Sequence, residues 1–361
     1  MRIVLFIDIL IGGGAGRSVV TLFKTLNRLG VDTHLILIDP IIRTPIGEFE
    51  DKVHILNPDK NLPRFKPVKY RILAKKLKNL VNSLKPTIFI SNLQYADKIT
   101  YLANIPNSFF CIRNTMSADF LKFKKTEFQK KLKLFKLRKM YSNQNIIAIS
   151  KGIYTDLIEN VKISPKKLIL INNPFDIEQI QKLAEKENPN IPKEPYILHI
   201  GRYDIHQKRQ DLLLQAYKKL NPPYKLYLLG KGDDKEKIEE MIKQMGLEKK
   251  VIIAGFDPNP YPWIKNAKLA VLTSDYEGFV RVVVESLALN TPIVSTDCPG
   301  ADEVLVNELS PLLAKKGDVD DIAAKIDYNL KNPLKIEEKH YKKFKAENIA
   351  KEYIKLAEQY L

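Results

Sequence analysis

Two glutamates stand out in the segment "SDYEGFVRVVVESLAL", where Glu277 follows one apolar run and Glu285 lies inside the next. A carboxylate among Val282, Val283 and Val284 is costly to bury unless hydrogen-bond donors satisfy it. Sugar hydroxyls are such donors, so we expect Glu277 to contact a hexosyl ring and Glu285 a ribose. The alternative is that both are structural acids near the start of a helix.

The residues between the two glutamates are predicted to bind a diphosphate. A helix is expected over residues 280–289, and its first N–H groups and positive end suit a phosphate. The two carboxylates would then bracket the phosphates. Gly278 and Phe279 lead into this helix.

A second charged pair follows another predicted strand, in the segment "GRYDIHQKRQDLL". Arg202 stands at the strand end and Lys208 just before the next helix. Arginine offers two donors and lysine a point charge, so together they can bind two adjacent phosphates. The alternative is a pair of solvated basic residues.

Glycines follow two of the predicted strands, where they allow the backbone to approach a ligand closely. The first set, Gly13, Gly14, Ala15 and Gly16, precedes a helix and is expected to face a phosphate or another substrate group, or else to form a tight turn. It is not a dinucleotide fingerprint, because Arg17 occupies the third glycine place.

The other glycines, Gly230 and Gly232, stand in "LLGKGDD" and are expected to approach the same ligand as Arg202. Beyond the following strand come Phe256, Tyr261 and Trp263. One of these aromatic rings could flank a flat base, and core packing explains them equally well.

The elements that must position these residues alternate between short β-branched runs and helical patterns, which predicts parallel sheets in an α/β fold. Strands are expected at residues 2–8, 33–38, 52–56, 87–91, 108–112, 145–150, 168–172, 196–201, 225–230, 250–255, 269–274 and 291–296. Helices are expected at 18–29, 68–84, 118–140, 209–220, 234–246, 260–266, 280–289 and 341–361.

The proline-rich stretch 174–195 reads as a linker between two doubly wound, Rossmann-like domains facing a cleft. Ligands of such sheets bind at the carboxyl ends of the strands. The predicted boundaries are 1–173, 174–340 and a final helical segment, 341–361, whose apolar positions suit packing on a surface.

Charge is divided unevenly between the two halves. Residues 1–172 contain 30 Lys/Arg against 12 Asp/Glu, whereas the whole chain of 361 residues has a net charge of +17. The first half is therefore expected to meet something anionic, such as a membrane surface, a nucleic acid or a phosphorylated substrate. A solvated basic surface is the alternative.

The remaining composition points to a cytoplasmic protein. The cysteines, Cys111 and Cys298, have no metal-ligand spacing and are expected to be buried thiols in a reducing compartment. No segment has the length and apolarity of a transmembrane helix. The first residues read as a strand interrupted by Asp8, not as a signal peptide.

These motifs resemble the retaining glycosyltransferases of family GT4, which have the GT-B fold. The resemblance rests on Gly201-Arg202 with Lys208, on "LLGKGD", on Glu277 with Glu285, and on "NTPIVSTD" followed by "GADEVL". It is specific over residues 199–305 and loose over 1–150. It implies two Rossmann-like domains, the first binding an acceptor and the second a nucleotide sugar, with the last helix crossing back onto the first domain.

The resemblance also implies a reaction, the transfer of a hexose or N-acetylhexosamine from a nucleotide diphosphate sugar with retained anomeric configuration. A UDP-sugar is the expected donor. Neither a cofactor nor a metal is expected, because Arg202 and Lys208 would neutralise the leaving diphosphate. Glu285 would bind the ribose, and Glu277 would contact the donor sugar. The resemblance further implies that sugar and phosphate touch the backbone of Gly278, Phe279, Val280, Arg281 and Val282.

One position departs from the family pattern. Many members carry a histidine after a central strand of the first domain, whereas this chain has Arg113 and Asn114 there. No general base is assigned, and none is needed if the leaving phosphate assists front-face attack. Arg113 and Asn114 are instead expected to orient the acceptor.

The acceptor is expected to be membrane-linked, such as a lipopolysaccharide core or a polyprenyl-diphosphate sugar. Residues 118–140 carry nine basic residues interleaved with apolar ones, and a second basic stretch covers 60–85. A basic amphipathic helix suits an anionic membrane surface, so we expect peripheral binding to the inner face of the cytoplasmic membrane. The apolar members of the first stretch are Phe120, Leu121, Phe123, Phe128, Leu132 and Phe135.

Three other functions fit parts of this sequence. A nucleotide-sugar epimerase of the same fold would act on the donor alone, which leaves the basic half unexplained. A basic nucleic-acid-binding protein would need stacking platforms or a recognition helix, and neither is visible, so no nucleic-acid partner is expected. A dinucleotide oxidoreductase is disfavoured by the failed glycine fingerprint.

Overall fold

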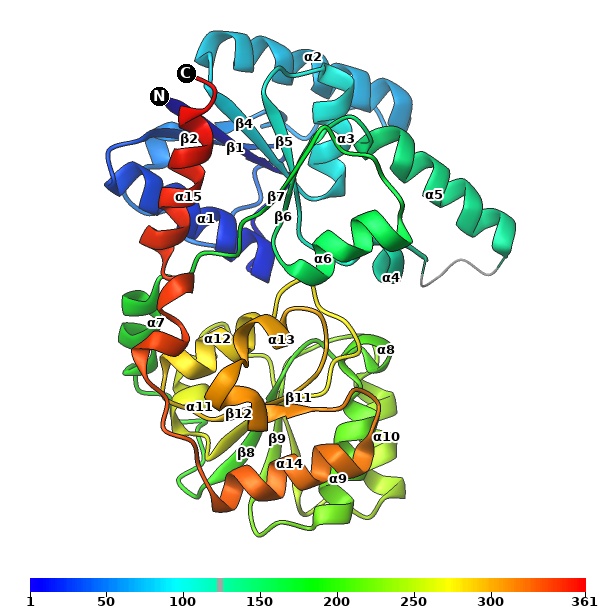
Figure 1. The fold of residues 1–361 in the computed structure, drawn as a ribbon, viewed down its shortest axis with the longest axis vertical. Coiled ribbons are helices and arrows are strands. Elements are labelled where there is room, and N and C mark those ends of the chain that lie inside the picture. The colour runs from blue at the N-terminus through cyan, green and yellow to red at the C-terminus, as the bar shows by residue number, and fades with distance from the viewer. Residues whose placement is uncertain (122–125) are drawn as a thin grey trace. The chain divides into compact units, whose positions relative to one another are not determined.

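A computed structural model describes residues 1–121 and 126–361. The chain folds into two compact units, one formed by residues 1–175 together with 344–361, the other by residues 176–343. Each unit is built around its own parallel sheet (Figure 1). The divisions lie within a few residues of the predicted ones.

The sheet of the first unit has seven parallel strands in the order β3-β2-β1-β4-β5-β6-β7. Its central strands are buried on both faces, as continuous apolar runs in a parallel sheet should be. The strands are β1 (Arg2–Ile7), β2 (Asp32–Leu37), β3 (Val53–Ile55), β4 (Ile88–Asn92), β5 (Ser108–Ile112), β6 (Asn145–Ala148) and β7 (Lys167–Leu170).

The helices of the first unit differ from the prediction in three places. Gln94–Ala103 and Lys151–Thr155 form helices that were not predicted, and the single helix expected over 118–140 is wrong. One helix ends at Leu121 and another begins at Glu127, where the Thr126 side chain accepts a hydrogen bond from the Gln129 N–H. The helices are α1 (Gly14–Arg28), α2 (Lys66–Leu84), α3 (Gln94–Ala103), α4 (Met116–Leu121), α5 (Glu127–Tyr141) and α6 (Lys151–Thr155).

The sheet of the second unit has six parallel strands in the order β10-β9-β8-β11-β12-β13, the doubly wound order of Rossmann-like sheets. The strand order reverses between β8 and β11, so the loops after these two strands meet. The strands are β8 (Tyr196–Ile200), β9 (Lys225–Leu229), β10 (Val251–Gly255), β11 (Leu269–Leu272), β12 (Ile293–Thr296) and β13 (Leu313–Ala314).

The helices of the second unit include one inside the predicted linker. The Asp176 side chain caps α7 by accepting from the Gln179 N–H, and α7 packs on α11 and α12. The segment is therefore part of this unit. The helices are α7 (Ile177–Ala184), α8 (Ile205–Lys208), α9 (Gln210–Leu220), α10 (Lys235–Gln244), α11 (Tyr261–Asn266), α12 (Arg281–Ala288), α13 (Ala301–Val304) and α14 (Val319–Lys331).

The last helix, α15 (Ala346–Glu358), belongs to the first unit, which confirms that the chain returns there. It lies beside α1, as Figure 1 shows. Ile349 and Tyr353 of the helix are buried, as is Phe344 just before it, whereas Lys351 and Lys355 are exposed. Within the described residues, no helix is long and apolar enough to cross a bilayer.

Candidate functional site

The predicted donor residues of the second unit follow the two strands at which its order reverses. Arg202 and Lys208 lie in the segment after β8, and Glu277 lies in the loop after β11. Because β8 and β11 are neighbours in the sheet, residues far apart in the sequence come together at this edge. Crevices at such reversals are where doubly wound sheets bind ligands.

Lys208 and Glu277 form an ion pair with 2.5 Å between Lys208 Nζ and Glu277 Oε1. The Ser274 hydroxyl donates to the same carboxylate oxygen at 2.6 Å. The lysine side chain is 14% exposed and the glutamate side chain 11% exposed, so the pair is largely shielded from water. The site thus places the predicted phosphate-binding cation against the predicted sugar-binding carboxylate.

Glu285 lies on α12 and is 1% exposed. Its Oε1 accepts from Arg281 Nη2 at 3.1 Å, one helical turn earlier. Arg281 thus supplies this buried carboxylate with a charged hydrogen-bond donor. The structure therefore separates the two glutamates, giving each its own cation.

The residues between the glutamates present mainly their backbone. The Phe279 and Val280 side chains are buried, and Gly278 has none. Val282 is half-buried on the first turn of α12, which begins at Arg281. A ligand at this helix start would therefore meet backbone atoms more than side chains of these residues, and their contact with a ligand stays a prediction.

The loop carrying Arg202 is held from beneath by buried polar residues. Gln210 Nε2 donates to the Arg202 carbonyl at 2.8 Å and lies 3.4 Å from His199 Nε2. Burial lowers the pKa of His199 to about 4, so the ring is neutral near pH 7. Its Nδ1 donates to the Val271 carbonyl, which leaves Nε2 as the acceptor for the Gln210 amide. The Arg202 side chain itself is exposed.

Gly230 and Gly232 are required by close backbone packing against the Arg202 loop. A Cβ on Gly230 would lie 1.9 Å from the Gly201 carbonyl oxygen, and one on Gly232 would lie 2.3 Å from the Tyr203 carbonyl oxygen. Both contacts are with backbone, which cannot give way as a side chain can. Their role in the structure is thus to let the loop after β9 approach the loop after β8.

We expect Gly232→Ala to lower the free energy of unfolding by about 1–3 kcal/mol, as overpacking usually does. Because the displaced backbone at Tyr203 adjoins Arg202, binding of the expected diphosphate ligand should weaken as well. Denaturant unfolding and titration calorimetry would measure both. Lys231→Ala, an exposed change between the two glycines, is the control and should cost no more than about 1 kcal/mol. Unchanged stability in Gly232→Ala would refute the packing role.

For the aromatic residues after β10, the sequence left open whether a ring flanks a ligand base or packs in the core. Tyr261 and Trp263 are buried and pack in the core. Phe256 is 58% exposed, and Lys231 Nζ lies 4.0 Å from the centre of its ring. Phe256 is therefore the one of these three whose face could meet a ligand.

The glycine segment of the first unit is shorter as a loop than predicted. Gly13 caps α1, so Gly14, Ala15 and Gly16 form the first helical turn. A Cβ on Gly16 would meet Leu10 at 3.6 Å, whereas Gly12 and Gly13 are exposed with open space around them. Only the beginning of the segment is thus open to a ligand as loop backbone.

Arg113 is buried in a network at the carboxyl edge of the first sheet. Its Nε donates to Asn92 Oδ1 at 2.9 Å and its Nη1 to Asn173 Oδ1 at 2.6 Å. Asn92 in turn donates to the Phe6 carbonyl, so the network joins the ends of β1, β4, β5 and β7. Asn114 is exposed beside it. The sequence pattern pointed to both positions but gave no sign of these partners.

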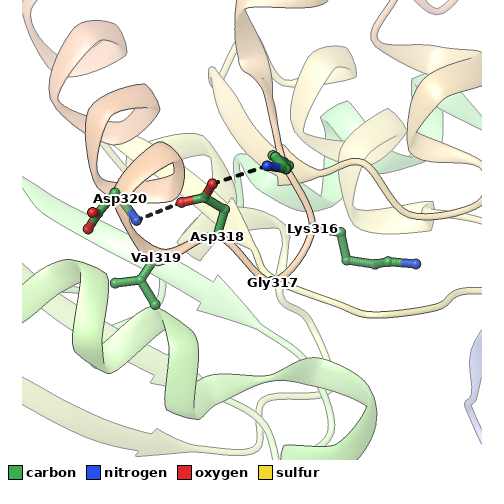
Figure 2. Close-up of a pocket in the computed structure, with 6 residues that line it drawn as sticks. Lys316, Gly317, Asp318, Val319 and Asp320 are labelled. Atoms are coloured by element: carbon green, nitrogen blue, oxygen red, sulfur yellow. Dashed lines mark hydrogen bonds and ion pairs between the residues drawn. The ribbon is translucent and has the colours of Figure 1, made fainter.

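A surface depression elsewhere on the second unit does not add to the site. Asp318 accepts from the Asp320 N–H, as Figure 2 shows, at a distance of 3.1 Å, and its Oδ2 lies 3.6 Å from Lys315 Nζ. Asp318 caps α14, so these contacts serve the helix start. Across the described part of the chain, no three His, Cys, Asp or Glu side chains gather as metal ligands would.

Comparison with known proteins identifies the family. Residues 12–179 match the model of Glycosyltransferase Family 4, and residues 180–350 match that of Glycosyl transferases group 1. The chain is 34% identical over 298 residues to an N-acetylgalactosamine-N,N'-diacetylbacillosaminyl-diphospho-undecaprenol 4-alpha-N-acetylgalactosaminyltransferase of Campylobacter jejuni, covering 81% of this chain and 80% of the relative.

Two further proteins agree with this family. A lipopolysaccharide 1,6-galactosyltransferase of Salmonella typhimurium is 27% identical over 52% of this chain and 53% of its own length. The crystal structure of HepE from Anabaena in complex with UDP superposes with a TM-score of 0.75 at 17% identity, covering 99% of this chain and all of that one. The chain belongs to the GT4 glycosyltransferases of GT-B fold and is a hexosyltransferase.

Proposed function

We propose that the protein transfers a hexose or N-acetylhexosamine from a UDP-sugar to a membrane-linked glycan, with retained anomeric configuration. The observation that carries the donor half is the Lys208–Glu277 pair at the strand-order reversal, with the buried Glu285 nearby in the sequence. The Campylobacter relative, named for transfer to an undecaprenol-linked sugar, supports the acceptor half.

Donor binding would exchange the partners of the existing ion pair. The diphosphate takes the Lys208 ammonium, together with Arg202, and the donor sugar's hydroxyls donate to the Glu277 carboxylate. Glu285 accepts from the ribose hydroxyls. The exchange costs little because each buried charge gains a new partner as it loses the old one.

The same two cations would make a metal unnecessary, because they neutralise the charge that develops on the leaving diphosphate. Retention would follow from attack on the face that the diphosphate leaves, with a phosphate oxygen taking the acceptor proton. The acceptor oxygen forms the new bond to the anomeric carbon as the bond to the diphosphate breaks. No protein base is assigned in this scheme.

Thermal stability with free nucleotides tests the donor assignment. UDP and one UDP-sugar should raise the melting temperature in the presence of EDTA, since a ligand at 100 times its Kd adds about 2.7 kcal/mol. GDP and NAD serve as controls. Stabilisation only by NAD, or only when a divalent metal is added, would contradict the proposal. An acceptor-independent conversion of the UDP-sugar to an isomer would instead favour the epimerase.

The acceptor half also involves the membrane, for which α5 is the proposed contact. Phe128, Leu132 and Phe135 recur at helical spacing and are 75%, 42% and 62% exposed. Exposed lysines flank them, among them Lys131 and Lys136. Figure 1 shows α5 extending away from the sheet of its unit. Apolar insertion beside cations is the chemistry of an anionic lipid surface.

Part of the predicted amphipathic stretch lies outside the residues that the structure describes. Phe123 lies within residues 122–125, outside the described residues, and the side chains of Phe120 and Leu121 are likewise outside the description. The apolar part of the proposed contact is therefore argued from α5. The second basic stretch contributes α2, on which Arg71, Lys75 and Lys78 are exposed.

Replacing both Phe128 and Phe135 by Ser should weaken binding to phosphatidylcholine vesicles containing phosphatidylglycerol by about tenfold or more, because two apolar rings no longer insert. Vesicle co-sedimentation would measure it. Tyr328→Ser, which removes a ring 49% exposed in the second unit, is the matched control. Equal binding by wild type and the double variant would refute α5 as the contact. Retention on DNA without vesicle binding would favour the nucleic-acid alternative.

A further inference from the structure

The two segments that carry the donor residues are fastened together by contacts that the proposed chemistry does not use. The Asp275 N–H donates to the Gln207 carbonyl at 2.9 Å, and Gln207 Nε2 donates to the Tyr276 carbonyl at 3.2 Å. The Thr273 hydroxyl lies 2.9 Å from the Lys208 carbonyl oxygen and 3.1 Å from the Arg209 carbonyl oxygen. These hydrogen bonds hold the loop after β11 against the C-terminal end of α8.

Arg209 stands at the centre of this junction. Its backbone is left-handed, with φ of 50° and ψ of 48°, and it separates α8 from α9. The Arg209 side chain contacts both α9, at Asp211, and the loop after β11, at Asp275. Nη1 lies 3.0 and 3.2 Å from the two Asp275 carboxylate oxygens, and Nε and Nη2 donate to Asp211 at 3.0 and 2.9 Å.

The guanidinium thus bridges two carboxylates with all three nitrogens engaged. Asp211 and Asp275 together raise the pKa of Arg209 above its already high value, although burial opposes this. The side chain is 26% exposed, and its two partners are 21% and 32% exposed. Geometry of this kind fixes direction as well as distance, because the planar fork matches the carboxylates.

The Arg209–Asp275 ion pair lies next to the donor residues in the sequence. Arg209 directly follows Lys208, and Asp275 comes two residues before Glu277. The charge pair therefore joins the backbones that bear both members of the Lys208–Glu277 pair. A donor sugar that is to be bound by Glu277 needs that carboxylate held to within a fraction of an ångström.

We propose that Arg209 is a positioning residue for recognition of the donor sugar, acting through Asp275 on Glu277. This inference rests on the proposed function of the donor site and goes beyond it. Asp275 touches neither sugar nor phosphate in this scheme. Because Asp275 lies on the same loop as Glu277, two residues before it, its loss should affect binding of the sugar more than binding of the diphosphate or the ribose.

The test compares Asp275→Asn with Asp211→Asn, which removes the other carboxylate from the same guanidinium. Titration calorimetry gives Kd for UDP and for UDP-N-acetylgalactosamine, UDP-N-acetylglucosamine, UDP-galactose and UDP-glucose. We expect Asp275→Asn to weaken the preferred UDP-sugar about tenfold while the Kd of UDP changes no more than about threefold. Asp211→Asn should change neither by more than about threefold, and Arg209→Lys should fall between Asp275→Asn and wild type.

Equal effects of the two aspartate variants, or a parallel loss of UDP and UDP-sugar binding in Asp275→Asn, would overturn the inference. Hydrogen exchange supplies a readout that needs no ligand. Asp275→Asn should speed exchange in peptides covering residues 273–280, and Asp211→Asn should not. If wild type binds no UDP-sugar, the proposed function fails, and unchanged exchange in Asp275→Asn would separately refute the positioning role.

Discussion

Glu277→Ala should lower the rate of sugar transfer at least about a hundredfold while leaving UDP binding intact. The carboxylate is expected to interact with the donor sugar as charge develops at the anomeric carbon, and losing one such preorganised group costs about this much. UDP lacks the sugar, so its Kd should stay within about threefold. It should even fall if Lys208, released from its 2.5 Å ion pair, binds the diphosphate more strongly.

Glu285→Gln should do the reverse, weakening UDP binding by about tenfold to a hundredfold. A hydrogen bond to a buried charged group is worth about 1.5–3 kcal/mol, and the ribose would lose such bonds. Gln is preferred to Ala because its amide oxygen can still accept the hydrogen bond from Arg281. Ala would leave the Arg281 guanidinium without this acceptor. Once UDP-sugar is saturating, the turnover rate should recover to within about tenfold of wild type.

The two variants are best measured together, by UDP calorimetry and by UDP release at saturating donor. Glu277→Gln is the matched control, since it can still accept from Ser274 but lacks the charge. It should resemble Glu277→Ala in turnover. Parallel loss of both UDP binding and turnover in the Glu277 and Glu285 variants would contradict separate roles for the two carboxylates.

The sequence was sufficient to predict both parallel sheets, because buried strands leave continuous β-branched runs that need no partner to be recognised. Helix limits were less accessible. Leu93, immediately before α3, has φ of 72°, a backbone conformation that no local pattern for leucine announces. The break before α5 was hidden because Lys and Phe continue at helical spacing on both sides of Thr126.

For the donor site, too, the sequence predicted some features and not others. The residue types and the spacing of the glutamates in the sequence indicated phosphate and sugar binding. The pairing of Glu285 with Arg281 spans four residues of one helix, a spacing that the sequence already contains. The pairing of Glu277 with Lys208 depends on the order of the strands, which no single segment of the sequence reveals. Arg209 and Asp275 were missed for this reason, since two exposed-looking charges 66 residues apart carry no signal of contact.

The second large expected effect is a pH dependence of stability caused by Asp97, a buried acid in the first unit. Asp97 on α3 is 2% exposed, accepts from Ser91 Oγ at 2.6 Å and accepts from the Tyr141 hydroxyl at 2.8 Å. Burial raises the pKa of Asp97 to about 7, and the two hydrogen bonds and the charge of Arg113 only partly oppose this. The folded protein therefore holds a proton on Asp97 that the unfolded chain releases near pH 4.

The sign of the pH dependence follows from this difference in bound protons. Between about pH 4 and pH 7 the folded state binds one proton more than the unfolded state, so stability falls as pH rises. One proton contributes about 1.4 kcal/mol per pH unit, or up to about 4 kcal/mol over this range. Above pH 7 both states are ionised at this position and the loss is complete.

Asp97→Asn cannot ionise and should therefore gain stability relative to wild type as pH rises from 4 to 7. Denaturant unfolding at several pH values would measure the difference curve, in which His34 and His54 cancel because both proteins retain them. Asp59→Asn, at an exposed position, is the control and should give a flat curve. A flat curve for Asp97→Asn would contradict the raised pKa. Tyr141 is the last residue of α5, so ionisation of Asp97 acts on the anchor of the helix proposed to meet the membrane.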